Sequence, residues 1–291
     1  MGTPSWQIGA VTVTAVVEID TEVPFAFLLP GATPDVVAAE SWVLPHWAVD
    51  TETMVLRLQA LAVESQDRRI VVDTCVGNNK PRPGLDLFDQ LQTSFLDDLE
   101  AAGFAPDTID TVLCTHLHID HVGWNTRLVD GAWVPTFANA RHLFARAEYE
   151  HWLAECDGDH MHASSFHDSV RPVVDAGMAD FVDPPFHLTD EVSLVPTTGH
   201  TPGHCSVLIE SDGQRAYITG DMSHHPIQLA RPALASSADT DQAGSTATRE
   251  RFVDEVCDTD TIVIGTHFGA PGAGRLRRVD GGVRFVALTQ S

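Results

Sequence analysis

The alternation of hydrophobic and polar residues predicts strands in the first part of the chain. Strands are expected at 11–16 and 55–63, where the alternation has a period of two, and at the short apolar runs 69–73 and 111–115. Apolar residues over 86–102 recur at helical spacing instead, and Gly103 follows them as a candidate C-cap. This part of the chain therefore predicts strands with one helix between them.

The second half repeats this mixture of elements. Strands are expected at 191–195, 205–210, 215–219 and 262–264, and helices at 163–178 and 248–257. A polar loop at 235–247 is too short to be a linker between domains. The order of elements predicts an α+β protein with two β-sheets and helices outside them, and we expect a single domain over 1–291.

The segment 23–50 follows neither period and is rich in Pro, Phe and Trp. We expect an ordered arm, because Phe25, Phe27, Leu28 and Trp47 all favour burial. Three interpretations stay open for this arm: an apolar lid over the site, the interface of a homodimer, or packing against a sheet.

Composition narrows the class of partner. The chain has 17 Lys and Arg against 41 Asp and Glu, a formal net charge of −24, which disfavours binding to nucleic acid or to an anionic membrane. Its five cysteines include no CxxC pair, and its first twenty residues resemble neither a signal peptide nor a membrane span. A cytoplasmic enzyme acting on a small molecule is expected.

One short motif carries most of the chemical information. His116, His118, Asp120 and His121 lie within six residues, directly after the apolar run 111–115. Imidazole and carboxylate groups suit zinc and similar divalent metals. In an irregular loop, His116 and His118 can face one ion while Asp120 and His121 face a second. The alternative, a solvated polar loop, requires this dense pattern to arise by chance.

Further ligand-type residues also follow apolar strands. They are His200 or His204 in the run GHTPGH, Asp221 in TGD and His267 in GTH. Side chains at several strand ends can meet on one rigid edge of a sheet sandwich. With the first motif they make seven ligands, the number that two metal ions sharing one carboxylate require.

The ordered motifs HxHxDH, GHTPGH, GD and TH resemble those of the metallo-β-lactamase-fold hydrolases, from Asp73 to His267. The resemblance implies an αββα sandwich with a dinuclear site at one edge. It assigns His116, His118 and His204 to one metal, Asp120, His121 and His267 to the other, and Asp221 as the bridge. The family pattern favours His204 over His200, because His204 directly precedes a strand; His200 would then support the turn.

The resemblance is greatest to the lactonase and small-ester hydrolase branch, which includes acyl-homoserine lactonases and the methyl parathion hydrolase type. Some β-lactamases of this fold have Cys at the position of Asp221, and flavodiiron relatives have Glu at that of His118. Acyl-homoserine lactonases carry a tyrosine three residues after the bridging aspartate, and this chain has His224 there. The branch implies hydrolysis of a small lactone or ester.

The predicted cofactors are two divalent ions, Zn²⁺ first, with Mn, Fe and Co accepting the same ligands. A hydroxide bridging the ions would attack the carbonyl carbon. Asp120 and His224 are the catalytic candidates: Asp120 would move the proton to the leaving group, and His224 would line the pocket unless it is a surface residue. Asp73 would hold a ligand imidazole or cap its strand.

Other interpretations remain open. The same fold supports an organophosphate triesterase-type hydrolase and a mononuclear iron oxidoreductase resembling persulfide dioxygenases, and a non-catalytic metal scaffold is a third alternative. The remaining histidines are expected to be ordinary core or surface residues: His46, His142, His151, His160, His162, His167 and His187.

Overall fold

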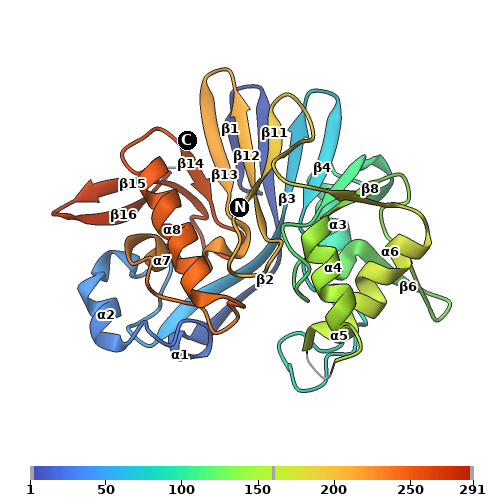
Figure 1. Ribbon diagram of the computed structural model, residues 1–291, viewed down its shortest axis with the longest axis horizontal. Helices are drawn as coiled ribbons and strands as arrows, with labels where there is room; N and C mark the ends of the chain where they lie inside the picture. The colour runs from blue at the N-terminus through green and yellow to red at the C-terminus, as the bar shows by residue number, and fades with distance from the viewer. Residues whose placement is uncertain (1–2, 159–160, 289–291) are drawn as a thin grey trace.

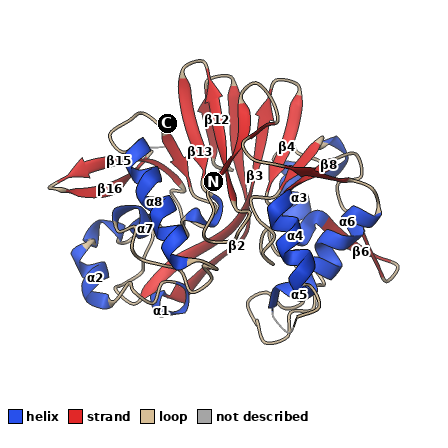
Figure 2. Ribbon diagram, viewed as in Figure 1, coloured by secondary structure: helices blue, strands red, loops and turns tan. Residues whose placement is uncertain are grey.

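The computed structural model describes residues 3–158 and 161–288. In this described part the long strands form two sheets that pack face to face, with helices on both outer sides (Figures 1 and 2). The first sheet has the order β1-β2-β3-β4-β5-β8-β9. Its strands are β1 (Ser5–Ile8), β2 (Val11–Pro24), β3 (Thr53–Ser65), β4 (Arg68–Val72), β5 (Thr111–Leu113), β8 (Arg141–Ala145) and β9 (Ala179–Val182).

The second sheet has the order β10-β11-β12-β13-β14-β15-β16. Its strands are β10 (Phe186–His187), β11 (Val192–Pro196), β12 (Cys205–Ser211), β13 (Gln214–Ile218), β14 (Ile262–Ile264), β15 (Ala273–Val279) and β16 (Gly282–Ala287). Both sheets are mixed: the pairs β4–β5, β5–β8, β8–β9 and β13–β14 are parallel, and the other pairs are antiparallel. A separate hairpin joins β6 (Thr126–Val129) and β7 (Ala132–Pro135).

Apolar side chains form three layers that hold the sandwich together. The central layer packs the two sheets against each other, with Val63 and Val72 from the first and Val207 and Ile218 from the second. A second cluster lies between the outer face of the first sheet and its helices, and a third covers the outer face of the second sheet. The predicted αββα architecture is confirmed.

The helices lie on opposite sides of the sandwich, as Figure 1 shows. On the side of the second sheet are α1 (Phe25–Leu28), α2 (Pro34–Ala39), α7 (Pro226–Ala230) and α8 (Gln242–Val256). On the side of the first sheet are α3 (Phe95–Ala101), α4 (Arg146–Glu155), α5 (Met161–Ser165) and α6 (Arg171–Asp175). Single turns lie at η1 (Ser41–Val43), η2 (Pro106–Thr108), η3 (Gly123–Asn125), η4 (Phe166–Val170, π-helical) and η5 (Gly220–Met222).

Several predicted elements change in the structure. The helix expected over 86–102 begins only at Phe95, because Gln90 has a positive φ of 51° and the Asp89 carboxylate accepts the backbone N–H of Arg82. The helix expected over 163–178 is divided into α5, η4 and α6, with Pro172 in the first turn of α6. Strands β15 and β16, which follow the last predicted strand, were not predicted.

The arm at 23–50 is ordered and largely packed against the second sheet's outer layer. Phe25 and Trp47 are buried there, and the Trp47 indole donates to the carbonyl of Pro271. Phe27 and Val49 are exceptions, with 61% and 49% of their surfaces exposed. Packing against a sheet therefore accounts for most of the arm. Within the described residues, no helix has the length and apolar character needed to span a membrane.

Candidate metal centre

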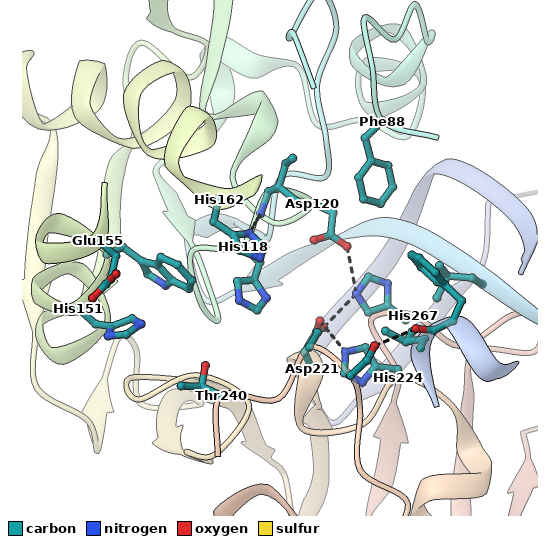
Figure 3. Close-up of a pocket in the computed structure, with 17 residues that line it drawn as sticks. Phe88, His118, Asp120, His151, Glu155, His162, Asp221, His224, Thr240 and His267 are labelled. Carbon is teal, nitrogen blue, oxygen red and sulfur yellow. Dashed lines mark hydrogen bonds and ion pairs between the residues drawn. The ribbon is translucent and has the colours of Figure 1, made fainter. Parts of the chain in front are cut away.

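Ligand-type side chains gather where strands of both sheets end. His116 follows β5, His200 follows β11, Asp221 follows β13 and His267 follows β14. The ends of β5, β13 and β14 are buried in the sandwich, and a short segment leads from each of these strands, and from β11, to its ligand, so the side chains converge at one edge. Figure 3 shows His118, Asp120, Asp221 and His267 facing the same space.

The first cluster consists of His116, His118, His200 and Asp221, all buried, whose ligand atoms lie within 4.8 Å of one another. Nε2 of His200 is 3.0 Å from Nδ1 of His118 and 3.4 Å from Oδ2 of Asp221. Nε2 of His116 has no hydrogen-bond partner and lies 3.7 Å from the same oxygen. Three imidazole nitrogens and a carboxylate oxygen therefore face one small volume.

The second cluster consists of Asp120, His121 and His267, again with ligand atoms within 4.8 Å. The two Nε2 atoms of His121 and His267 are 3.2 Å apart. The Asp120 carboxylate lies 3.8 Å from His121 and 3.6 Å from His267. Its side chain is 17% exposed, so Asp120 is the member of this cluster that faces the cavity most openly.

Asp221 lies between the two clusters. Its Oδ1 is 3.0 Å from Nε2 of His267 and 3.3 Å from that of His121, whereas its Oδ2 faces His116 and His200. Each oxygen thus belongs to one cluster. This is the arrangement that a carboxylate shared by two ions requires.

The structure corrects the assignment of His204. Both of its ring nitrogens are engaged elsewhere: Nε2 accepts the backbone N–H of Asp221 at 2.9 Å, and Nδ1 faces Thr197. The strand β12 begins one residue later and holds this side chain beneath the cluster. His200, at the tip of the preceding loop, reaches the cluster instead. The two residues therefore exchange the roles that the sequence analysis gave them.

Buried groups orient the candidate ligand imidazoles by contacting the ring nitrogen that faces away from the clusters. The Asp73 carboxylate lies 2.9 Å from Nδ1 of His121 and accepts the backbone N–H of Thr115. The carbonyl of Arg57 lies 2.8 Å from Nδ1 of His267. Partners of this kind fix the tautomer in which Nε2 keeps its lone pair. Asp73 therefore contacts a candidate ligand, as one of its two interpretations predicted.

The protonation states differ between the two clusters. Burial lowers the pKa of His116 and His118 well below the usual value of a histidine, so both rings are neutral at pH 7. Burial opposes ionisation of Asp221, yet the neighbouring histidines, His121 first, hold its pKa well below the usual range. Burial opposes the charged form of His121 and His267 too, but the charge of Asp221 outweighs it and raises the pKa of both rings above the usual value, so a bound cation would displace protons from these two imidazoles.

The clusters open into a cavity of about 700 Å³. Its lining includes the candidate ligands His118, Asp120, Asp221 and His267. The other lining residues are Phe27, Leu28, Leu56, Phe88, Ile119, His151, Trp152, Glu155, His162, His224, Ser237, Ala238 and Thr240. Much of this wall is apolar, and no Lys or Arg is among the described residues that line it.

His224 lines the cavity beside Asp221, in agreement with the prediction. Its Nε2 lies 3.1 Å from Oδ2 of Asp221, and its ring is parallel to that of His267 with centroids 5.7 Å apart. Phe27 and Leu28 also reach the cavity wall, so the arm contributes to it while packing elsewhere.

The sequence analysis missed two histidines of the cavity wall, His151 and His162. The His162 ring stacks on that of His118, with centroids 4.0 Å apart, and its Nδ1 accepts the backbone N–H of Ile119. No periodic pattern marks this divided helix; the histidine-rich run around 160–167 is the one available signal. His160 lies outside the described residues.

Comparison with known proteins extends these observations. An N-acyl homoserine lactonase of Bacillus sp is 26% identical over 198 residues, which are 60% of this chain and 69% of the relative. The N-acyl homoserine lactonase AttM of Agrobacterium fabrum is 28% identical over 156 residues, which are 50% of this chain and 54% of the relative. The chain therefore spans only part of the length of these relatives.

Two solved structures resemble the whole chain. The hydrolase AbOPH, described as in the beta lactamase superfamily, has a TM-score of 0.81 at 22% identity, covering 100% of this chain and 98% of its own. AidC, described as a dizinc quorum-quenching lactonase in complex with its product, has a TM-score of 0.77 at 19% identity with the same coverage. At these identities the likeness shows the fold alone. Residues 59–283 match the family described as the Metallo-beta-lactamase superfamily, and with this match over most of the sandwich, the chain belongs to that superfamily.

Proposed function

We propose that the chain is a dinuclear metal-dependent hydrolase that acts on small lactones or esters. The observation that carries this proposal is the position of Asp221, with one oxygen toward each ligand cluster. Two separate single-metal sites would not require a shared carboxylate. Both curated relatives described above are named N-acyl homoserine lactonases, and this supports lactones as the substrate class.

The residues fit a pair of divalent cations. Nε2 of His116 and Oδ1 of Asp221 are buried and have no hydrogen-bond partner, which is costly unless another group binds them. Ring nitrogens of His200 and His118 lie 3.0 Å apart, and a cation between such groups would satisfy both lone pairs. His116, His118, His200 and Asp221 would hold one ion; Asp120, His121, His267 and Asp221 would hold the other. Zn²⁺ suits this donor set, and the description of AidC as a dizinc enzyme supports it.

When bound, the two ions would supply a bridging hydroxide at neutral pH and polarise the substrate carbonyl. Asp120 is placed to handle the proton, because its partly exposed carboxylate faces the cavity beside His267. It would take the proton from the attacking oxygen and deliver it to the alkoxide oxygen as the C–O bond breaks. The products are a carboxylate and a hydroxyl group, which in a lactone belong to one molecule.

The cavity favours an uncharged substrate. Asp120, Glu155 and Asp221 are among its lining residues, while neither Lys nor Arg is found in its described wall. The net charge of −24 adds a repulsive field for anions. Apolar residues such as Phe27 and Phe88 would contact a hydrocarbon part of the substrate. These features support a neutral lactone or ester over an anionic one.

Metal analysis followed by a hydrolysis screen tests the proposal. We expect close to two transition metal ions per chain, and hydrolysis of lactones or aryl esters that is lost with a chelator and restored by Zn²⁺. Phosphotriesters in the same screen test the organophosphate alternative. A chain that holds one iron ion, oxidises persulfides and leaves every ester intact would overturn the proposal in favour of the oxygenase alternative.

A further inference from the structure

A buried carboxylate lies directly behind the candidate ligand His200. Oδ1 of Asp239 is 3.0 Å from Nδ1 of His200, whose Nε2 points into the first cluster. Both side chains are fully buried. Asp239 belongs to the polar loop before α8, and neither the ligand motifs nor the mechanism above uses it.

Asp239 is itself held by a buried cation. Its Oδ2 accepts the backbone N–H of Ser236 at 2.9 Å and lies 3.5 Å from Nη1 of Arg249. The Arg249 side chain is also fully buried, and it donates to the carbonyl of Pro232 and to the hydroxyl of Ser245. A buried guanidinium is costly without an anionic partner, so the contact with Arg249 holds the Asp239 carboxylate in place.

Backbone hydrogen bonds clamp the same loop onto the turn that carries His200. The N–H of Thr240 donates to the carbonyl of His200 at 2.8 Å, and the N–H of Asp241 donates to that of Gly199 at 2.9 Å. Gly199 has a φ of +128°, and a Cβ there would lie 2.2 Å from the backbone nitrogen of Ser245. The carboxylate and the imidazole are therefore aligned by a rigid local framework.

We propose that Asp239 is a positioning residue that fixes the tautomer and orientation of His200 and thereby sets the metal affinity of the first cluster. A carboxylate can only accept at this position, so Nδ1 of His200 carries the proton and Nε2 keeps its lone pair for the ion. The negative charge also makes the imidazole a stronger donor. This inference rests on the metal binding assumed in the proposed function.

The loop that carries Asp239 also forms part of the cavity wall. Ser237, Ala238 and Thr240, the residues around Asp239, line the cavity. The N–H of Ser237 donates to the carbonyl of Leu28, which also lines the cavity. A change of wall residues in this loop would therefore also displace the carboxylate that supports His200.

The test compares Asp239→Asn with Asp241→Asn, the same chemical change two residues further on. Asp241 is exposed and caps α8 through the N–H of Gly244, without contacting the His200 ring. Competition with a chelator should show one of the two Zn²⁺ ions bound about 10- to 100-fold more weakly in Asp239→Asn and the other unchanged. The Co²⁺-substituted variant should show an altered visible spectrum, and Asp241→Asn should match the wild type in both measurements.

Each outcome decides between the hypotheses. Unchanged affinities and an unchanged Co²⁺ spectrum in a folded Asp239→Asn variant would overturn the positioning role. The ¹⁵N spectrum of metal-free wild-type protein gives a second measurement that does not need a stable variant: His200 should carry its proton on Nδ1, and a proton on Nε2 would overturn the inference. A wild-type chain that binds two ions but hydrolyses no ester would overturn the proposed function and leave the Asp239 result standing.

Discussion

The Nε2 atom of His204 accepts the backbone N–H of Asp221 at 2.9 Å, so this histidine fixes the residue that lies between the two clusters without joining them. Thr197 occupies its other nitrogen, and burial lowers the pKa of His204 to about 3, which keeps the ring neutral and able to accept. A ring whose two nitrogens are engaged in this way has no lone pair for a metal.

The exchange of roles between His200 and His204 can be tested with the same substitution at both positions. His200→Gln should lower the metal content from about two ions per chain toward one, because the first cluster loses an imidazole. His204→Gln should keep about two ions, since the amide oxygen can still accept the N–H of Asp221, with a lower Tm from the imperfect fit. Metal analysis and thermal unfolding give both values. Loss of metal in His204→Gln alone would return the ligand role to His204.

The sequence predicts residues at strand ends better than residues in loops. The HxHxDH motif follows a buried strand, and the strand positions His116 and His118 almost directly. GHTPGH instead offers two histidines in one loop, and only the path of the chain between β11 and β12 decides which of them faces the metal site. Local pattern does not encode that path. The choice of His204 from its place before a strand was therefore wrong.

The cavity wall was less predictable for a related reason. Phe88 lies in a segment whose apolar spacing predicts a helix, but side-chain hydrogen bonds fold it as a loop. Asp239 lies in a polar loop with no motif, and its role arises from contact with His200, 39 positions away in sequence. Such positions are set by tertiary contacts between distant segments, which periodicity does not report.

A buried charge cluster lies outside the two ligand clusters. Lys80, the chain's single lysine, and Arg82 are fully buried against Asp168, with Nη1 of Arg82 2.7 Å and Nζ of Lys80 3.5 Å from its carboxylate. Asp168→Asn leaves two buried cations without an anion and should lower the free energy of unfolding by about 3 kcal/mol or more. Asp183→Asn, which alters an exposed ion pair with Arg146, should cost less than about 1 kcal/mol. Unfolding by denaturant measures the loss of unfolding free energy in each variant. Equal losses in the two variants would contradict the role that is assigned to burial.

His142 should make stability sensitive to acid. Burial, and then the charge of Arg141, lowers its pKa from 6.5 to about 3. Below pH 6.5 the unfolded chain therefore binds a proton that the folded chain does not, and stability falls as the pH falls toward 3. The expected slope for this group is about 1.4 kcal/mol per pH unit.

His142→Phe should remove that contribution. As the pH is lowered from 7 to 4, the unfolding free energy of the metal-free wild type should therefore fall more steeply than that of the metal-free variant, while the other histidines titrate equally in both. Parallel stability curves over this range would show that His142 binds its proton equally in the folded and unfolded chains, which would contradict the lowered pKa.

Phe27 is exposed and lines the cavity, which predicts a role in substrate binding with little effect on stability. Phe27→Ala should raise KM about tenfold for esters with a long apolar chain, the scale of burying part of an aromatic ring. For short-chain esters KM should change little, because these do not reach the ring. The control is Leu128→Ala, an exposed apolar residue of the β6–β7 hairpin. An equal KM change for long and short chains would contradict this contact.

The variant Asp120→Asn tests whether Asp120 moves a proton in addition to serving as a metal ligand. The variant keeps one coordinating oxygen, and His121 and His267 still face the second ion, so most of the metal should be retained. If Asp120 moves the proton to the leaving group, kcat should fall about 100-fold or more for esters of poorly acidic alcohols. The loss should be much smaller for nitrophenyl esters, whose leaving group needs no proton. The control is His46→Ala on the exposed surface, which should change neither metal content nor rate. An equal loss of kcat for both ester types, with full metal content in Asp120→Asn, would mean that Asp120 acts only as a ligand.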